Sequence, residues 1–191
     1  AIESCPALKE RICSPRAKDS GNTILLKEFP GGILILTGAN SPSGLRSMPI
    51  RYLFLDEVDG FPDEAGTEGD PVDLAVQRTA TFSNRKIFMV STPTIKDASR
   101  IEQAFMEGDQ RYYHVPCPEC GHMQPLRWAN LKFDPKNLTE ACYECEKCKA
   151  HWHDWQKDQI LTKGKWIATH PEHTNVASFH LSSLYSPHGW T

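Results

Sequence analysis

The chain has 191 residues, of which 39% are hydrophobic and 24% are charged, and its formal net charge is −3. This length can bury a hydrophobic core and hold one medium domain, or one domain with a small module. The charge excludes a surface that is basic throughout, so any contact with nucleic acid must be made by a local patch or a lined channel.

The two ends of the chain suggest a larger parent. The sequence begins at Ala1 without a methionine and stops at Thr191 just after an apolar segment, so we expect a fragment. It contains no apolar run of membrane-spanning length and no signal-peptide pattern. These features predict a cytoplasmic protein with no membrane partner.

Two β-rich runs open the ordered part of the sequence. Residues 24–26 and 33–36 are predicted strands, and the Pro-Gly-Gly within residues 29–32 is a strong turn signal between them. The small residues at 37–44 would suit a loop close to a phosphate or a plain strand-to-helix turn. They are not a P-loop, because no Gly-Lys-Ser/Thr follows them.

Residues 51–59 carry the strongest catalytic pattern. Four apolar residues, 52–55, lead directly into Asp56 and Glu57. Such a run predicts a strand buried on both faces of a parallel sheet, with its carboxylates at the edge where open α/β sheets bind ligands. In a Walker B motif of this kind, Asp56 would help to hold Mg²⁺ on nucleotide phosphates and Glu57 would activate water. The alternative is a strand that ends in a solvated acidic turn.

The next helix and strand supply further candidates. Asp70 is a predicted N-cap and Pro71 a first helical residue, and Arg78 on this helix would point either toward a nucleotide or to the surface. A second buried strand is predicted at 85–90, before Ser91 and Thr92. Hydroxyl groups beside a Walker B strand could sense the γ-phosphate, although Ser-Thr-Pro-Thr alone is also a common turn.

The sequence changes in character after a predicted helix at 99–108, which has Ser99 as its cap. Five of the seven cysteines lie within 32 residues, in Cys-x-x-Cys spacings. Two such knuckles predict a zinc ribbon whose four thiolates leave no open position, so the Zn²⁺ would be structural and needed for folding. The predicted ligands are Cys117, Cys120, Cys145 and Cys148. Cys142 is an alternative ligand, and His122, His151 and His153 are possible substitutes.

The last part of the chain reads as a short helix followed by strands. The helix is predicted at 154–163, with Trp152, Trp155 and Ile160 as its packing residues. Strands are predicted at 164–166 and 176–181. The net fold prediction from these patterns is α/β: part of a parallel-sheet domain, followed by a small zinc-ribbon-like β module.

These motifs occur in a specific order. The series consists of residues 31–32, 38–42, 56–59, 69–71, 91–94, 117–121 and 179–187. It resembles the large terminase subunit of tailed phages, of the lambda-like type, over nearly the whole chain. The resemblance implies an α/β fold that is part of a parallel-sheet P-loop (ASCE) NTPase domain lacking its Walker A segment. It also implies three segments: residues 1–112 from the later part of the ATPase domain, 113–153 as the zinc module, and 154–191 as a connector toward a nuclease domain.

The resemblance also implies a function. The parent would be a DNA-packaging motor that hydrolyses ATP with Mg²⁺, with Asp56 as metal ligand, Glu57 as catalytic glutamate, and Ser91 and Thr92 in the ATP-coupling motif. Its partners would be double-stranded viral DNA, a small terminase subunit and the portal of a procapsid, within a homo-oligomeric motor in the host cytoplasm. The sequence contains no Walker A lysine and no nuclease carboxylates after Pro187, so the isolated chain is expected to be inactive.

Two other functions fit the same residues. Asp-Glu-Val-Asp at 56–59 and Ser-Thr-Pro at 91–93 also resemble motifs of helicase-type DNA-remodelling motors. A non-catalytic zinc-ribbon module that binds DNA or protein is the third reading, supported by the absence of a phosphate-binding loop. Four glutamates near the knuckles offset the lysines there, which favours a structural role for the zinc module over direct DNA binding.

Overall fold

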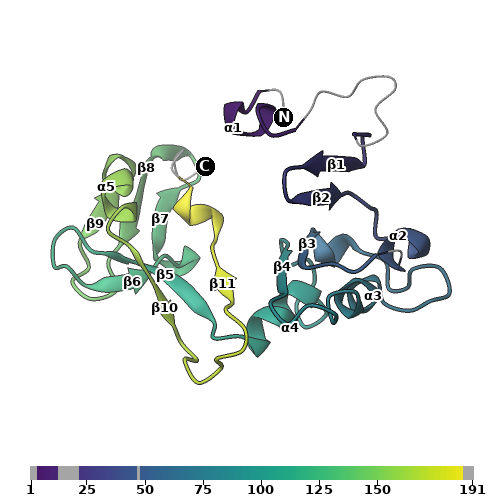
Figure 1. Ribbon diagram of the computed structural model, residues 1–191. Helices are drawn as coiled ribbons and strands as arrows, with labels where there is room; N and C mark the ends of the chain where they lie inside the picture. Colours follow the sequence, from purple (N-terminus) through teal and green to yellow (C-terminus); the bar gives the residue numbers. More distant parts are fainter. Residues whose placement is uncertain (1–3, 13–21, 47, 187–191) are drawn as a thin grey trace. The chain divides into compact units, whose positions relative to one another are not determined.

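The computed structural model describes residues 4–12, 22–46 and 48–186 (Figure 1). Pro187, which belongs to one of the motifs above, lies outside these residues. The chain forms two compact units, Ala1–Thr92 and Pro93–Thr191. The predicted boundaries at 112 and 153 do not coincide with this division, because the strand that spans residue 112 pairs with strands near the end of the chain. As domains of a larger protein, the three segments stay a prediction.

The first unit combines one β-hairpin, one parallel strand pair and short helices. Its elements are α1 (Pro6–Lys9), β1 (Leu26–Phe29), β2 (Gly32–Ile35), α2 (Pro42–Arg46), β3 (Tyr52–Asp56), η1 (Val58–Gly60), α3 (Pro71–Gln77) and β4 (Lys86–Val90). The expected hairpin is present, and Phe29 belongs to β1 rather than to the turn. Gly31 makes the reversal possible with a φ of 94°, a conformation that costs glycine little.

The strand β3 pairs with β4 in parallel, as predicted, but it is not buried on both faces. Leu53 and Leu55 are buried, whereas Tyr52 and Phe54 are 51% and 71% exposed. This corrects the sequence-based prediction for β3, and β4 is likewise mostly exposed. The reason is the period of two along a strand: in the described residues β3 and β4 form a two-stranded sheet, and only one face of β3 is covered.

The helix α3 begins as its sequence predicts. The Asp70 side chain accepts hydrogen bonds from the backbone N–H groups of Val72, at 2.7 Å, and Asp73, at 3.2 Å. Pro71 occupies the first turn, where it has no hydrogen bond to lose. Asp70 therefore fixes the end of the loop that follows β3.

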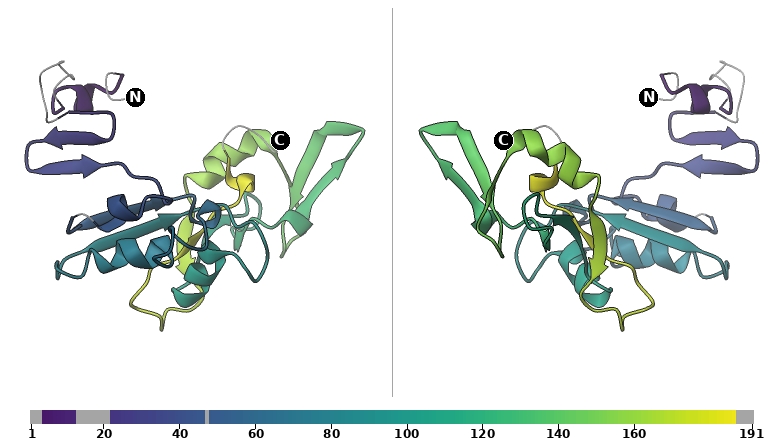
Figure 2. Two further views of the ribbon diagram at one scale, coloured as in Figure 1. Left: turned by 90° about the vertical axis from the view of Figure 1, so that its right-hand side faces the viewer. Right: turned by 90° about the vertical axis from the view of Figure 1, so that its left-hand side faces the viewer.

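The second unit is built around β5. Its elements are α4 (Arg100–Glu107), β5 (Arg111–Pro116), β6 (Met123–Pro125), η2 (Trp128–Asn130), β7 (Leu131–Asp134), β8 (Asn137–Glu144), β9 (His151–His153), η3 (Asp154–Gln156), α5 (Lys157–Leu161), β10 (Lys165–Ala168), β11 (Phe179–His180) and η4 (Ser183–Tyr185). In one sheet β5 lies between the antiparallel β10 and the parallel β11, and β6 also pairs with it. A second sheet has the order β7-β8-β9, and Figure 2 shows β7 and β8 as a long hairpin.

The core of this unit joins the cysteine-rich segment to the residues after it. It contains Val115, Cys117, Leu126, Leu131, Tyr143, Cys145, Trp152, Ile160, Leu184 and Tyr185. Trp152 and Ile160 pack as predicted, but Trp155 is 76% exposed, which corrects its predicted role in packing. The side chain of Trp155 lies in the short η3, one turn before α5, and this turn faces solvent there.

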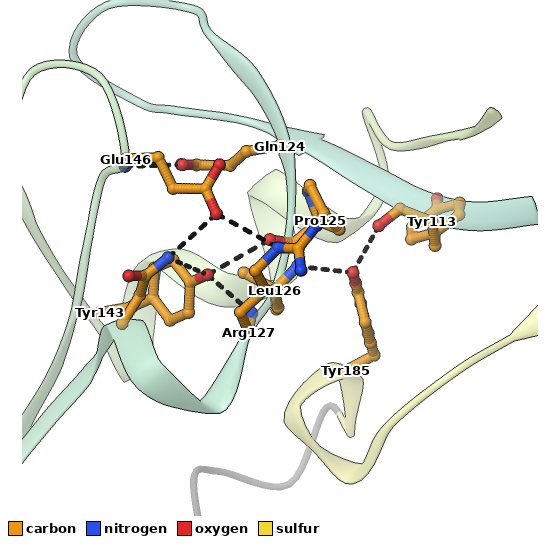
Figure 3. A network of polar contacts seen from close by, with 9 residues as sticks. Tyr113, Gln124, Pro125, Leu126, Arg127, Tyr143, Glu146 and Tyr185 are labelled. Carbon is orange, nitrogen blue, oxygen red and sulfur yellow. Dashed lines mark hydrogen bonds and ion pairs between the residues drawn. The ribbon is translucent and has the colours of Figure 1, made fainter. Parts of the chain in front are cut away.

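Two buried tyrosine hydroxyls hold the strands of the core together (Figure 3). The Tyr185 hydroxyl accepts from the N–H of Leu126 at 2.7 Å and donates to the carbonyl of Tyr113. The Tyr143 hydroxyl accepts from the N–H of Arg127 at 2.8 Å. Burial raises the pKa of Tyr185 to about 12, so this hydroxyl keeps its proton at neutral pH.

None of the helices in the described ranges is long and apolar enough to cross a bilayer.

Candidate functional site

The predicted carboxylates lie at one end of the parallel strand pair. Asp56 is the last residue of β3 and stands in register with Val90, the last residue of β4. Ser91 and Thr92 follow immediately, so the carboxylates and the hydroxyl residues share the same edge. Asp56, Glu57 and Thr92 are exposed and Ser91 is half-buried, which leaves this edge open to a ligand.

The turn after β3 is tied to the end of β4. The backbone N–H of Asp59 donates a hydrogen bond to Ser91 Oγ at 3.2 Å. Glu57 has φ 55° and ψ 48°, a left-handed conformation that is uncommon for a residue with a Cβ atom. Such backbone strain is concentrated at functional sites, where the surrounding structure holds it in place. The 3₁₀ turn η1 follows Glu57 and buries Val58, which anchors the turn.

The backbone of Arg78 is anchored away from this edge. Its backbone carbonyl accepts from the N–H of Ile50, which precedes β3. The strand from Tyr52 to Asp56 is about 13 Å long at the usual rise per residue, so Arg78 is anchored near the opposite end from the carboxylates. This places the backbone of Arg78 only, and the contact between its side chain and a nucleotide stays a prediction.

The second candidate site is a group of four sulfurs. The Sγ atoms of Cys117, Cys120, Cys145 and Cys148 all lie within 4.8 Å of one another. Two of the separations are 3.7 Å, between Cys117 and Cys148, and 3.9 Å, between Cys120 and Cys145. A tetrahedral site with zinc–sulfur bonds of about 2.3 Å requires about 3.8 Å between its sulfurs, so the thiol positions fit such an ion.

The two knuckles have the same backbone construction. Cys117 N–H donates to the carbonyl of His122 and Cys145 N–H to that of Ala150, each at 2.9 Å. In each knuckle the N–H of the second cysteine points to the sulfur of the first, at 3.5 Å. The first knuckle connects β5 to β6 and the second connects β8 to β9, so a bound ion would join the two sheets.

Cys142 is separate from this group. It lies within β8, where it stands opposite His153 of β9 and Lys132 of β7, and it is buried. The four-sulfur group therefore contains Cys145 and Cys148 and not Cys142, while their role as metal ligands stays a prediction. His122, His151 and His153 are not part of the four-sulfur group.

Comparisons with known proteins place the chain in a family. A family model described as "Phage terminase large subunit gpA, ATPase domain" matches residues 1–166. The chain belongs to this family. It is 30% identical over 175 residues to a protein named "Terminase, large subunit" from Enterobacteria phage P21, an alignment that covers 87% of the chain and 27% of the relative. It is 26% identical over 202 residues to the "Terminase, large subunit" of Escherichia phage lambda, covering 89% of the chain and 30% of the relative.

The family membership confirms the resemblance stated from the motif order. The chain spans less than a third of the length of the curated terminase subunits that it matches. No solved structure matches it significantly. The α/β class expected for the terminase ATPase domain is confirmed in general terms, with the parallel pair β3 and β4 in the first unit.

The thiols of the four-cysteine group in this terminase-family chain differ in how readily they lose a proton. Burial acts to raise the pKa of Cys145, but backbone N–H groups, beginning with that of Cys148, lower it to about 6. The N–H of Ala150 acts to lower the pKa of Cys148, yet burial and the other three thiols raise it to about 12. One thiolate therefore forms readily while its neighbour holds its proton, and a divalent cation would allow both to ionise.

Sequence reasoning missed two supporting contacts in this terminase-family chain. The first is the hydrogen bond from Asp59 N–H to Ser91 Oγ. The sequence indicated only that both residues follow the ends of predicted strands. The second is Gln124, whose side-chain oxygen accepts from the N–H of Glu146 at 2.8 Å and so links the first knuckle's hairpin to the second knuckle (Figure 3). A buried glutamine in a short strand has no spacing pattern that predicts its partner.

Proposed function

We propose that this chain carries the carboxylate edge of a phage DNA-packaging ATPase. The observation that supports the proposal best is the parallel register of β3 and β4, which aligns Asp56 with Val90. This register sets the acidic turn beside Ser91, with the hydrogen bond from Asp59 between them. Membership in the terminase ATPase family agrees with this reading of the residues.

Each residue of this edge has a separate role in the proposal. Asp56 supplies a carboxylate at the end of its strand, the type of oxygen ligand that Mg²⁺ prefers. Mg²⁺ with ATP would supply charge neutralisation at the phosphates. Glu57 orients water and takes its proton, and the fixed turn after β3 limits where its carboxylate can point.

Ser91 and Thr92 are proposed to couple hydrolysis to movement. Ser91 Oγ accepts from the backbone of the same turn that carries Glu57, so a shift of that turn would be passed directly to the end of β4. Thr92 is the last residue of the first unit, and the chain enters the second unit at Pro93. A change at Ser91 would therefore reach the segment that connects the two units.

The four cysteines are proposed to hold a structural Zn²⁺. Their sulfur separations fit a tetrahedral ion, and Cys117 and Cys145 are buried in the core of the second unit. The ion would cross-link two sheets and would perform no chemistry on a substrate, because four thiolates leave no open position. For the larger protein we propose viral DNA, a small terminase subunit and the portal of a procapsid as partners, in an oligomeric motor in the host cytoplasm, with a nuclease domain elsewhere in its chain.

The test is ATP turnover by the full-length parent with DNA and procapsids, comparing wild type with Glu57→Gln. Loss of hydrolysis with ATP binding retained is expected, because the amide keeps the size of the side chain but cannot take a proton. Glu64→Gln, a change at an exposed acid in the following loop, is the matched control and should hydrolyse normally. Unchanged turnover in Glu57→Gln would overturn the proposal. Turnover that needs neither portal nor procapsid and accompanies duplex unwinding would point to a helicase-type motor instead.

A further inference from the structure

A second group of metal-binding side chains lies in the connection between β10 and β11, seen in Figure 1. His170, Glu172 and His173 each offer a donor atom, and these three atoms lie within 4.8 Å of one another. The group is distinct from the four cysteines, and none of its members has a role in the carboxylate edge. We propose that it is a binding site for a divalent transition-metal ion of the type that imidazole prefers, such as Zn²⁺ or Ni²⁺.

The backbone holds these residues in a compact turn. The N–H of His173 donates to the carbonyl of His170 at 3.0 Å, which closes the turn on itself. The N–H of His170 donates to the carbonyl of Asp109 at 3.1 Å, which fastens the turn to the segment between α4 and β5. The two imidazole rings stack with their centres 5.5 Å apart, so the ligands are close before any ion binds.

Hydrogen bonds also fix which nitrogen atoms are available. His173 Nδ1 lies 3.0 Å from the carbonyl oxygen of Gly108. A carbonyl only accepts, so Nδ1 carries the proton and the lone pair of the neutral ring is on Nε2. Histidine ligands in metal sites are oriented in the same way, by donating the other N–H to a carbonyl or carboxylate. His170 Nδ1 lies 2.9 Å from Glu172 Oε1, which sets the carboxylate beside the imidazole.

The segment that supports His173 is itself well connected. Gly108 is followed by Asp109, which accepts from the N–H of Ser178 at 3.0 Å and from Arg111 Nε at 2.7 Å. Ser178 Oγ also accepts from the N–H of Gln110, at 2.8 Å. The carbonyl that orients His173 is thus part of a buried network, while the ligands themselves face solvent.

The distances are within reach of coordination. Ligand bonds of about 2.1 Å require neighbouring donor atoms about 3.0 to 3.4 Å apart. The side chains of His170 and Glu172 are 45% and 63% exposed, so small rotations can bring the donors together without disturbing the core. A bound ion would brace the turn between β10 and β11, and the His173 ring would keep its hydrogen bond to the carbonyl of Gly108 after α4.

The test uses the 191-residue chain with its cysteine site saturated with zinc, and Ni²⁺ as the probe. Calorimetry should show one Ni²⁺ bound per chain. His170→Ala, Glu172→Gln and His173→Ala should each weaken it at least about tenfold, a loss seen even for outer-shell changes. The matched control is His151→Ala, an exposed histidine 3.8 Å from Glu144, which should leave the affinity unchanged.

A second measurement does not depend on the folding of variants. Paramagnetic Ni²⁺ should broaden the ring signals of His170 and His173 in the wild-type spectrum before those of His151 and His180. Equal broadening of all histidines, or equal weakening by His151→Ala, would overturn the proposal. Neither experiment requires ATP hydrolysis, so the result is independent of the proposed packaging function.

Discussion

The carboxylate edge and the four-cysteine group are organised in opposite ways. The cysteine group has all four of its sulfurs on two short turns, each with hydrogen bonds inside the turn. The carboxylate edge depends on the pairing of β3 with β4, although 30 positions separate Asp56 at the end of β3 from Lys86 at the start of β4. It also depends on the hydrogen bond from Asp59 N–H to Ser91 Oγ. A site of local turns can be read from spacing, whereas a site at a sheet edge exists only when the strands pair in the right register.

The largest expected effect is the loss of the Zn²⁺ proposed for the four cysteines. Structural zinc contributes about 10 to 16 kcal/mol to the folding of small modules, which is comparable to the whole stability of a typical domain. Removal of the metal by a chelator, or Cys117→Ser, should therefore abolish the near-UV circular dichroism of Tyr143 and Trp152 in the core. Hydrogen exchange in β3 and β4 should stay unchanged, because those strands belong to the first unit.

Cys5→Ser is the matched control for this experiment, since Cys5 lies in the first unit outside the four-sulfur group. It should leave the metal content at its wild-type value. A second unit that keeps its near-UV signal without metal would show that the core alone is sufficient. The expectation that the cysteine group needs a metal to fold the second unit would then be wrong.

A smaller effect is expected at Tyr185. Tyr185→Phe leaves the N–H of Leu126 and the carbonyl of Tyr113 without their shared partner. An unsatisfied buried polar group costs about 1 to 3 kcal/mol, so the free energy of unfolding should fall by about that amount. Denaturant titration at saturating zinc, followed by tryptophan fluorescence, measures the change, because all five tryptophans lie after residue 93.

Tyr112→Phe provides the comparison for this hydroxyl. The Tyr112 ring packs against Phe105 and His180, and these ring contacts remain in the variant. Its effect should be clearly smaller than that of Tyr185→Phe. Equal losses for the two variants would mean that the hydroxyl network of Figure 3 does not stabilise the unit.

The smallest change in stability is expected for a substitution at Glu57. Asparagine adopts the left-handed conformation more readily than glutamate, so Glu57→Asn should slow hydrogen exchange around η1 by an amount worth under about 1 kcal/mol. The same change removes the carboxylate that the proposed hydrolysis needs. Glu64→Asn serves as the reference variant, and faster exchange in Glu57→Asn than in this reference would contradict strain at the site.

The sequence predicted the features that are local. The Asp70 cap, the strand that ends at Asp56 and the two separate cysteine knuckles all follow from residues close together in the chain. The family was also recognisable, because it depends on the order of motifs rather than on their contacts. The metal identity and the roles of Asp56, Glu57, Ser91 and Thr92 stay predictions.

The sequence did not predict which of two neighbouring apolar side chains is buried. Phe54 and Leu53 are equally apolar neighbours, yet one is exposed and the other buried, because only one face of β3 is covered. Trp155 and Trp152 differ in the same way, since the chain turns between them. Arg78 shows that a correct helix does not place a residue in a site. Its helix was predicted, but only the backbone hydrogen bond from Ile50 shows which end of β3 the Arg78 backbone lies near.

The pairing of the two knuckles has a mechanical consequence. With a metal ion bound, the chain from Cys120 to Cys145 becomes a closed loop between two fixed points. A force that pulled on the two ends of the protein would pass through the ion and bypass this loop. About 85 Å of contour length would then stay hidden until a metal–sulfur bond broke. An extension step of that size in single-molecule stretching, absent without metal, would report the rupture of the cross-link.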